Sequence, residues 1–130
     1  MEIKVVIDDR DGYLDVINML GSVPPFDSLG LREKQVLSEL NYWYNFYIDT
    51  PEQVRQVMTF DYKTRVAIMN KLDVSVEVLN NNLTSLRKKG FITGRELIIK
   101  LPKIVVGQAY PVVFNCRIKP YEEANLVNND

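Results

Sequence analysis

The strongest constraint in this sequence is the order of helix start and stop signals between residues 61 and 101. Asp61 stands directly before one helical pattern, and a three-residue connection that ends in Ser75 separates this pattern from a second one. Both residues carry side-chain oxygens that can cap the helix that follows them. Gly90 then supplies the glycine that commonly follows a helix end. Because the connection is so short, the two helices must pack against each other as neighbours.

The spacing of apolar residues predicts helices over residues 62–72 and 76–89, followed by a β-hairpin. In the hairpin, residues 91–92 and 97–99 are apolar and flank a Thr-Gly-Arg-Glu turn at residues 93–96. The residues that we expect to be buried in the two helices are Val66, Ile68 or Met69, Leu72, Val76, Leu79, Leu83 and Leu86.

Two further helices are predicted upstream of this region. The first covers residues 31–47, with Gly30 as its N-cap and Glu33 placed to reach back to the backbone. The second is short, begins after Pro51, and has an apolar side made of Val54, Val57 and Met58 that we expect to be buried. The apolar stripe of the first helix consists of Val36, Leu37, Leu40, Trp43, Tyr44 and Tyr47.

The two ends of the chain show the alternation of apolar and polar residues that is typical of strands. One such stretch covers residues 1–7 and the other residues 112–119, and we expect the two to pair. Residues 13–20 read as a short helix, which the prolines at residues 24–25 separate from the rest. The polar residues 121–130 are expected to fray.

The region from residue 61 to residue 101 resembles the winged helix-turn-helix superfamily. Ala67 lies where that superfamily keeps a small residue, and Leu72, Val74 and Leu79 occupy its usual core positions around the turn. Asp73 departs from the glycine that is commonest in the turn, but aspartate also tolerates a left-handed backbone. The resemblance implies an α+β fold, with a helical core, a β-hairpin wing and short flanking strands at both termini.

We therefore expect four segments along the chain. These are an N-terminal strand or arm with a linker (1–29), the winged helix-turn-helix domain (30–101), a C-terminal strand (102–120) and a polar tail (121–130).

The charge of the chain is unevenly distributed. The formal net charge is -1, but residues 62–103 hold nine basic and three acidic residues, a net charge of +6. The remaining residues carry seven basic and fourteen acidic side chains, a net charge of -7. Such asymmetry favours one face that is built for an anion.

The polar side of the predicted helix over residues 76–89 is the candidate recognition surface. Its side chains are of the types that read base edges or bind phosphate, and a helix fits the major groove of DNA. Lysines and arginines there and in the hairpin would contact phosphates. The candidate DNA-binding residues are Glu77, Asn80, Asn81, Thr84, Ser85, Arg87, Lys88, Lys89, Arg95 and Lys100.

Several kinds of chemistry are disfavoured by composition. The chain has no histidine and a single cysteine, Cys116, so the commonest general base and the usual zinc ligands are missing. Asp8, Asp9, Asp11 and Asp15 lack the glycine and the final glutamate of a calcium loop. We expect no catalytic residues, no metal and no cofactor, and therefore not an enzyme.

The sequence leaves two functions open. The first is double-stranded DNA binding as a small transcriptional or replication-associated regulator. The second is a winged-helix protein-interaction or assembly module, for example a bacteriophage particle or packaging component. The overall acidity, the aromatic helix at residues 43–47 and the two strand-like ends favour this second function. As a short chain rich in asparagine and lysine, the protein is similar to small proteins of bacteriophages and mobile elements. Oligomer or other subunit contacts are expected through the aromatic helix 31–47 and the terminal strands.

The aromatic residues at 42–44 and 46–47 can also be interpreted as a stacking platform for single-stranded bases, although helical spacing favours core packing. No apolar run is long enough to cross a membrane, and the charged start of the chain does not fit a secretory signal. We expect a cytoplasmic protein, located in the host cytoplasm or in a virion if the assembly function holds.

Overall fold

The computed structural model of the chain describes residues 2–4, 9–104 and 109–111. Its regular elements are helices and two small antiparallel sheets, so the fold class is α+β, as the sequence predicts. The helices are α1 (Asp9–Met19), the 3-10 helix η1 (Phe26–Ser28), α2 (Leu31–Phe46), α3 (Glu52–Thr59), α4 (Tyr62–Leu72) and α5 (Val76–Lys88). The strands are β1 (Glu2–Lys4), β2 (Ile92–Thr93), β3 (Glu96–Leu97) and β4 (Ala109–Pro111).

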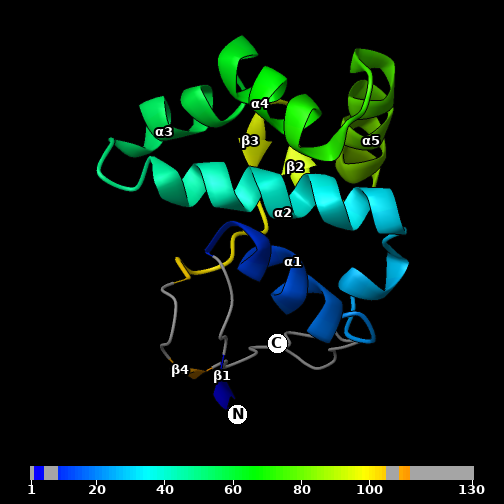
Figure 1. Cartoon of the computed structure of the whole chain (residues 1–130), viewed down its shortest axis with the longest axis vertical. Coiled ribbons are helices and arrows are strands. Elements are labelled where there is room, and N and C mark those ends of the chain that lie inside the picture. Colours follow the sequence, from blue (N-terminus) through cyan, green and yellow to red (C-terminus); the bar gives the residue numbers. More distant parts are fainter. Residues whose placement is uncertain (1, 5–8, 105–108, 112–130) are drawn as a thin grey trace, which may run out of the picture.

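The helix α2 lies in the middle of the molecule, with α1 on one side and α3, α4 and α5 on the other (Figure 1). Its side chains Val36, Leu37 and Leu40 are at most 1% exposed. The predicted apolar stripe thus packs against neighbours on both sides of the helix. The helix α2 is therefore the scaffold that positions the other helices.

The segment that precedes α2 contributes to the same apolar core. The helix predicted over residues 13–20 is present as α1, although it begins at Asp9 and ends at Met19. Ile17 and Leu20 are buried together with Phe26 from η1 and the apolar side chains of α2. Residues 9–29 therefore pack as part of the helical body.

Two apolar residues of α3, Val54 and Val57, are exposed to solvent. The prediction that they are buried is therefore wrong. These side chains are 47% and 66% exposed, whereas Gln56 and Thr59 are buried. The side chain of Gln56 accepts a hydrogen bond from the backbone nitrogen of Leu97 (2.8 Å) and donates one to its carbonyl oxygen (3.2 Å). Buried backbone groups need such partners, and this need sets the orientation of α3.

The two neighbouring helices predicted between residues 62 and 89 are confirmed as α4 and α5. The Asp61 carboxylate accepts a hydrogen bond from the backbone nitrogen of Thr64 (2.8 Å), and the Ser75 hydroxyl accepts one from that of Val78 (3.2 Å). Both caps are those that the sequence predicts. Between the helices, Asp73 has a φ of +54°, the left-handed conformation expected at this turn.

The predicted β-hairpin is also present, and β2 pairs with β3 so that Ile92 lies opposite Leu97. Gly94 occupies the first position of the two-residue turn and has a φ of +58°, a backbone angle that residues other than glycine rarely adopt. Phe91, Ile92 and Leu97 are at most 1% exposed. The hairpin is thus anchored in the core by its apolar side.

The buried side of α5 agrees with the sequence prediction except at its first residue. Leu79, Leu83 and Leu86 are 1%, 4% and 0% exposed. Val76, which we expected to be buried with them, is 47% exposed. Val76 is the first residue of α5, so it lies at the end of the helix rather than over the packed middle.

The terminal strands form a separate small sheet, in which β1 pairs antiparallel with β4. Ile3 lies opposite Tyr110 in this pair. The other parts of the predicted terminal strands, at residues 5–7 and 112–119, and the tail at residues 121–130 lie outside the described residues. Within the described residues, no helix has the length and apolar character needed to cross a membrane.

Candidate nucleic-acid interface

One line of side chains on α5 points away from the core. Since Leu79, Leu83 and Leu86 are buried, the residues on the opposite side of the helix face outward. Glu77, Asn81, Thr84 and Lys88, which we call the α5 stripe, are all exposed. Their spacing of three or four residues places them in one row along the helix. The sequence predicts this row, because it needs only the period of the helix.

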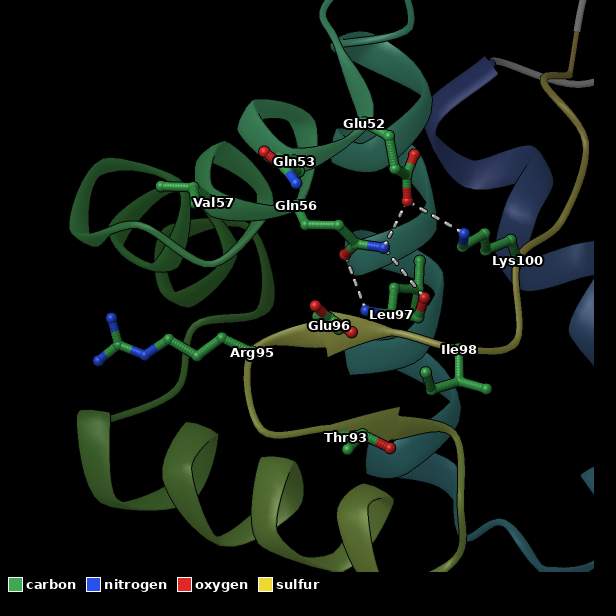
Figure 2. Close-up of a pocket in the computed structure, with 10 residues that line it drawn as sticks. All are labelled: Glu52, Gln53, Gln56, Val57, Thr93, Arg95, Glu96, Leu97, Ile98 and Lys100. Atoms are coloured by element: carbon green, nitrogen blue, oxygen red, sulfur yellow. Dashed lines mark hydrogen bonds and ion pairs between the residues drawn. The ribbon is translucent and has the colours of Figure 1, made fainter.

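The hairpin turn is fastened to the end of α5 by Arg87. Its Nε atom donates a hydrogen bond to the carbonyl oxygen of Gly94 (2.8 Å). Arg95, the next residue of the turn, extends from the hairpin into solvent (Figure 2). Arg87, Lys88 and Arg95 therefore place three positive charges at one end of α5 and on the adjoining turn.

Two of the candidate residues, Ser85 and Lys89, are half-buried and contact α2. Ser85 donates a hydrogen bond to the carboxylate of Glu33. Lys89 forms an ion pair with Glu33 (2.7 Å) and donates a hydrogen bond to the carbonyl oxygen of Ser28 (2.5 Å). The structure thus uses these two side chains to hold α5 against α2 and η1, away from the α5 stripe.

Glu33 is the centre of this contact. It is buried, and its carboxylate also accepts a hydrogen bond from the backbone nitrogen of Gly30 (2.7 Å), as the sequence predicts. Burial raises the pKa of Glu33, but the hydrogen bonds from Gly30, Lys89 and Ser85 outweigh it and leave the pKa lowered. The link to α5 spans more than fifty residues of chain, so no local sequence signal indicates it.

Lys100 is placed apart from the other candidate residues. It forms an ion pair with Glu52 (3.2 Å) and lies at the opposite end of a surface hollow from Arg95 (Figure 2). Burial lowers the pKa of Lys100, but the hydrogen bonds with Glu52 and Tyr44 outweigh it and raise the pKa. The structure therefore does not group Lys100 with the charges at the end of α5.

The hollow itself lies between α3 and the hairpin and has a volume of about 860 Å³ (Figure 2). The hydrogen bond from the Tyr44 hydroxyl (2.6 Å), with those from Gln56 and Lys100, lowers the pKa of Glu52 to about 2. These side chains already satisfy one another, so the charges of Glu52 and Lys100 at this end of the hollow are neutralised. Its lining residues are Glu52, Gln53, Gln56, Val57, Thr93, Arg95, Glu96, Leu97, Ile98 and Lys100.

The aromatic residues at the end of α2 pack against each other. Trp43 contacts Tyr42 and Phe46 edge to face, with ring centroids 5.0 and 5.1 Å apart. Tyr44 is 5% exposed and belongs to the core, whereas Phe46 is 60% exposed. Edge-to-face packing covers ring faces that stacked bases would need. The arrangement favours a packed aromatic cluster over a stacking platform.

Some of the acidic side chains form ion pairs. Asp11 pairs with Lys71 (3.1 Å), and Glu39 with Arg10 (2.6 Å). Within the part of the chain that the structure describes, no group of three or more histidine, cysteine or acidic side chains could hold a metal ion.

Comparison with models of known protein families gives no match, and neither does comparison with curated proteins or with solved structures.

Proposed function

We propose that the chain is a double-stranded DNA-binding protein of the winged helix-turn-helix kind, with α5 as the recognition helix and the β2–β3 hairpin as the wing. Helix α4, the turn at Asp73, α5 and the hairpin occur in the order that this architecture requires. The role would be that of a small transcriptional or replication-associated regulator.

The observation that carries this proposal is the joining of a polar helix face to a positively charged turn. The α5 stripe offers exposed polar side chains for a groove, and Lys88 continues it towards Arg95 on the hairpin. The bond from Arg87 to Gly94 keeps turn and helix together, so the charges can reach the phosphates beside one groove.

Three glutamates on the neighbouring helices support the same interpretation by their placement. Glu33, Glu39 and Glu52 lie on α2 and α3, where each forms an ion pair with a basic side chain. They are therefore partly neutralised and do not belong to the α5 stripe. On α5 and the hairpin, the acidic side chains are Glu77 and Glu96.

The test is a fluorescence anisotropy titration of duplex DNA at several salt concentrations. With two or three phosphate contacts, the slope of log affinity against log salt should be about -2 to -3. Lys88→Ala and Arg95→Ala should each flatten the slope by about one unit. Lys103→Ala removes an exposed charge next to Ile104, in the segment that packs on α1, and should leave the slope unchanged. Absence of binding at low salt by folded protein would refute the proposal.

A second candidate function is a protein-interaction module, and the outward side of α3 favours it. Val57 and Ile98 line the hollow beside the hairpin and are 66% and 49% exposed, and Val54, three residues before Val57 on α3, is 47% exposed. Exposed apolar side chains that gather in this way are typical of contact surfaces. If this surface joins two copies of the chain, Val57→Asp should convert a dimer into a monomer in light scattering. Leu31→Asp, at a 71% exposed position on α2, is the matched control.

A further inference from the structure

We propose that α5 selects A·T base pairs, with Asn81 binding an adenine and Thr84 contacting the methyl group of a thymine. This inference rests on the proposed function, because it concerns what the α5 stripe reads once the helix lies in the major groove. Adenine offers one acceptor and one donor there, and thymine offers an acceptor and a methyl group.

The three consecutive asparagines of α5 differ in what their side chains can still bind. Asn82 donates a hydrogen bond to the backbone carbonyl of Val78 (2.8 Å), so its amide is engaged within the helix. Asn80 and Asn81 are exposed and form no side-chain hydrogen bond with any described residue. Bidentate binding of adenine needs both the amide oxygen and the amide nitrogen, which are free at these two positions.

Position along the helix singles out Asn81 from Asn80. Asn81 lies on the α5 stripe, four residues after Glu77 and three before Thr84, whereas Asn80 lies at the flank that carries Arg87. The stripe from Glu77 to Lys88 is about 16 Å long, which is the length of about five base pairs. Asn81 and Thr84 are thus close enough to contact neighbouring base pairs.

Guanine lacks its usual partner on the first three residues of the stripe, because none of them is basic. It presents two acceptors in the major groove and is bound most often by arginine or lysine. Glu77 is an acceptor and repels the guanine edge, and it could accept only from the amino group of a cytosine, at the start of the stripe. Arg87, the first basic residue of α5, lies beside the hairpin turn, to which its Nε is bound, and Lys88 comes only at the end of the stripe. The available chemistry therefore favours A·T pairs at the centre of the contact.

The experiment begins with selection of bound duplexes from a randomised pool. The recovered duplexes should contain a shared run of A·T pairs. Each adenine of that run is then replaced by 7-deazaadenine, which lacks the N7 acceptor but pairs normally. At one position this change should weaken binding of the unaltered protein by about 5- to 100-fold. The same replacement should not weaken DNA binding by the Asn81→Ala variant, which has already lost the partner of N7.

Two matched substitutions complete the experiment. Asn82→Ala removes an amide that is engaged within α5, so this variant should respond to 7-deazaadenine like the unaltered protein. Replacing thymine by uracil removes only the methyl group, and at one position the resulting loss should be absent from Thr84→Ser. Circular dichroism confirms that each variant is folded.

The results that would overturn the inference differ from those that concern the proposed function. Salt-dependent binding without base preference, or an A·T preference that persists in Asn81→Ala and is insensitive to 7-deazaadenine, leaves DNA binding intact and refutes base reading by Asn81. Selection of a site made of G·C pairs would likewise leave DNA binding intact and refute base reading by Asn81. Absence of binding to every duplex refutes both proposals.

Discussion

Leu83 lies in the middle of the buried side of α5, between Leu79 and Leu86, and is 4% exposed. Leu83→Ala would leave a cavity where α5 packs on α2. We expect it to lower the free energy of unfolding by about 2–5 kcal/mol, measured by urea denaturation. Val76→Ala, at a 47% exposed position on the same helix, should cost less than about 1 kcal/mol. Equal effects of the two changes would contradict the described packing of α5.

Gln56 provides a second test at the scale of one residue. Its amide binds both the backbone nitrogen and the carbonyl oxygen of Leu97. Gln56→Leu fills a similar volume but leaves these buried groups without partners. We expect a loss of about 1–3 kcal/mol in the free energy of unfolding. Gln53→Leu, one turn earlier at an exposed position of α3, is the control and should change little.

These residues also show which features of the packing can be predicted from the sequence and which cannot. The burial of Leu79, Leu83 and Leu86 follows from helical spacing, which is a local property of the chain. The outward position of Val57 does not, because it depends on a bond between Gln56 and a backbone group 41 residues away. The partners of buried polar groups are set by tertiary structure, and hydrophobic periodicity carries no information about them.

At the scale of elements, the caps and turns determine where helices begin and end. Asp61, Ser75 and the glycines at the hairpin and helix end act within a few residues, so the bounds of α4 and α5 could be predicted closely. The orientation of α3 could not, since it depends on the bonds between Gln56 and Leu97 of β3, which lies 41 residues further along the chain. Local chemistry thus predicts the elements better than the faces they bury.

The turn between α4 and α5 offers a prediction at this scale. Asp73 has a φ of +54°, which is strained for residues with a side chain. Asp73→Gly removes this strain but increases the conformational freedom of the unfolded chain. We therefore expect the free energy of unfolding to rise by less than about 1 kcal/mol. Asp73→Val should lower the free energy of unfolding by about 1–2 kcal/mol, because a β-branched side chain fits this conformation poorly. Thermal unfolding measures both, and an unchanged Asp73→Val would contradict the left-handed turn.

At the scale of the whole molecule, the packing around α2 depends on side chains that link distant segments. Asn41 accepts a hydrogen bond from the backbone nitrogen of Leu101 (2.7 Å), and Asn45 donates one to its carbonyl oxygen (3.1 Å). Glu33 joins the start of α2 to Ser85 and Lys89 of α5. The sequence predicts the core helices of this assembly, but polar links across the molecule become visible only in three dimensions.

Glu33 makes the integrity of this arrangement sensitive to acid. Its folded-state pKa is lowered from the ordinary value of 4.5, because the hydrogen bonds from Gly30, Lys89 and Ser85 outweigh the opposing effect of burial. A group of this kind stabilises the fold above its unfolded-state pKa, and the stabilisation is lost as the pH falls through the lower folded-state pKa. The contact of α5 with α2 should therefore weaken in acid.

We expect Glu33→Gln to unfold with a free energy about 1–2 kcal/mol lower than that of the unaltered protein at neutral pH, because a hydrogen-bonded charge pair is lost. The difference should shrink as the pH falls below 4.5, because the Glu33 carboxylate then takes up a proton in the unfolded chain, whereas in the folded protein it keeps its charge until the pH reaches the lower folded-state pKa. Urea denaturation between pH 7 and about pH 3 measures it. Glu77→Gln removes the same charge from the exposed side of α5 and serves as the control. A difference for Glu33→Gln that stays constant with pH would show that its ionised form does not hold α5 in place.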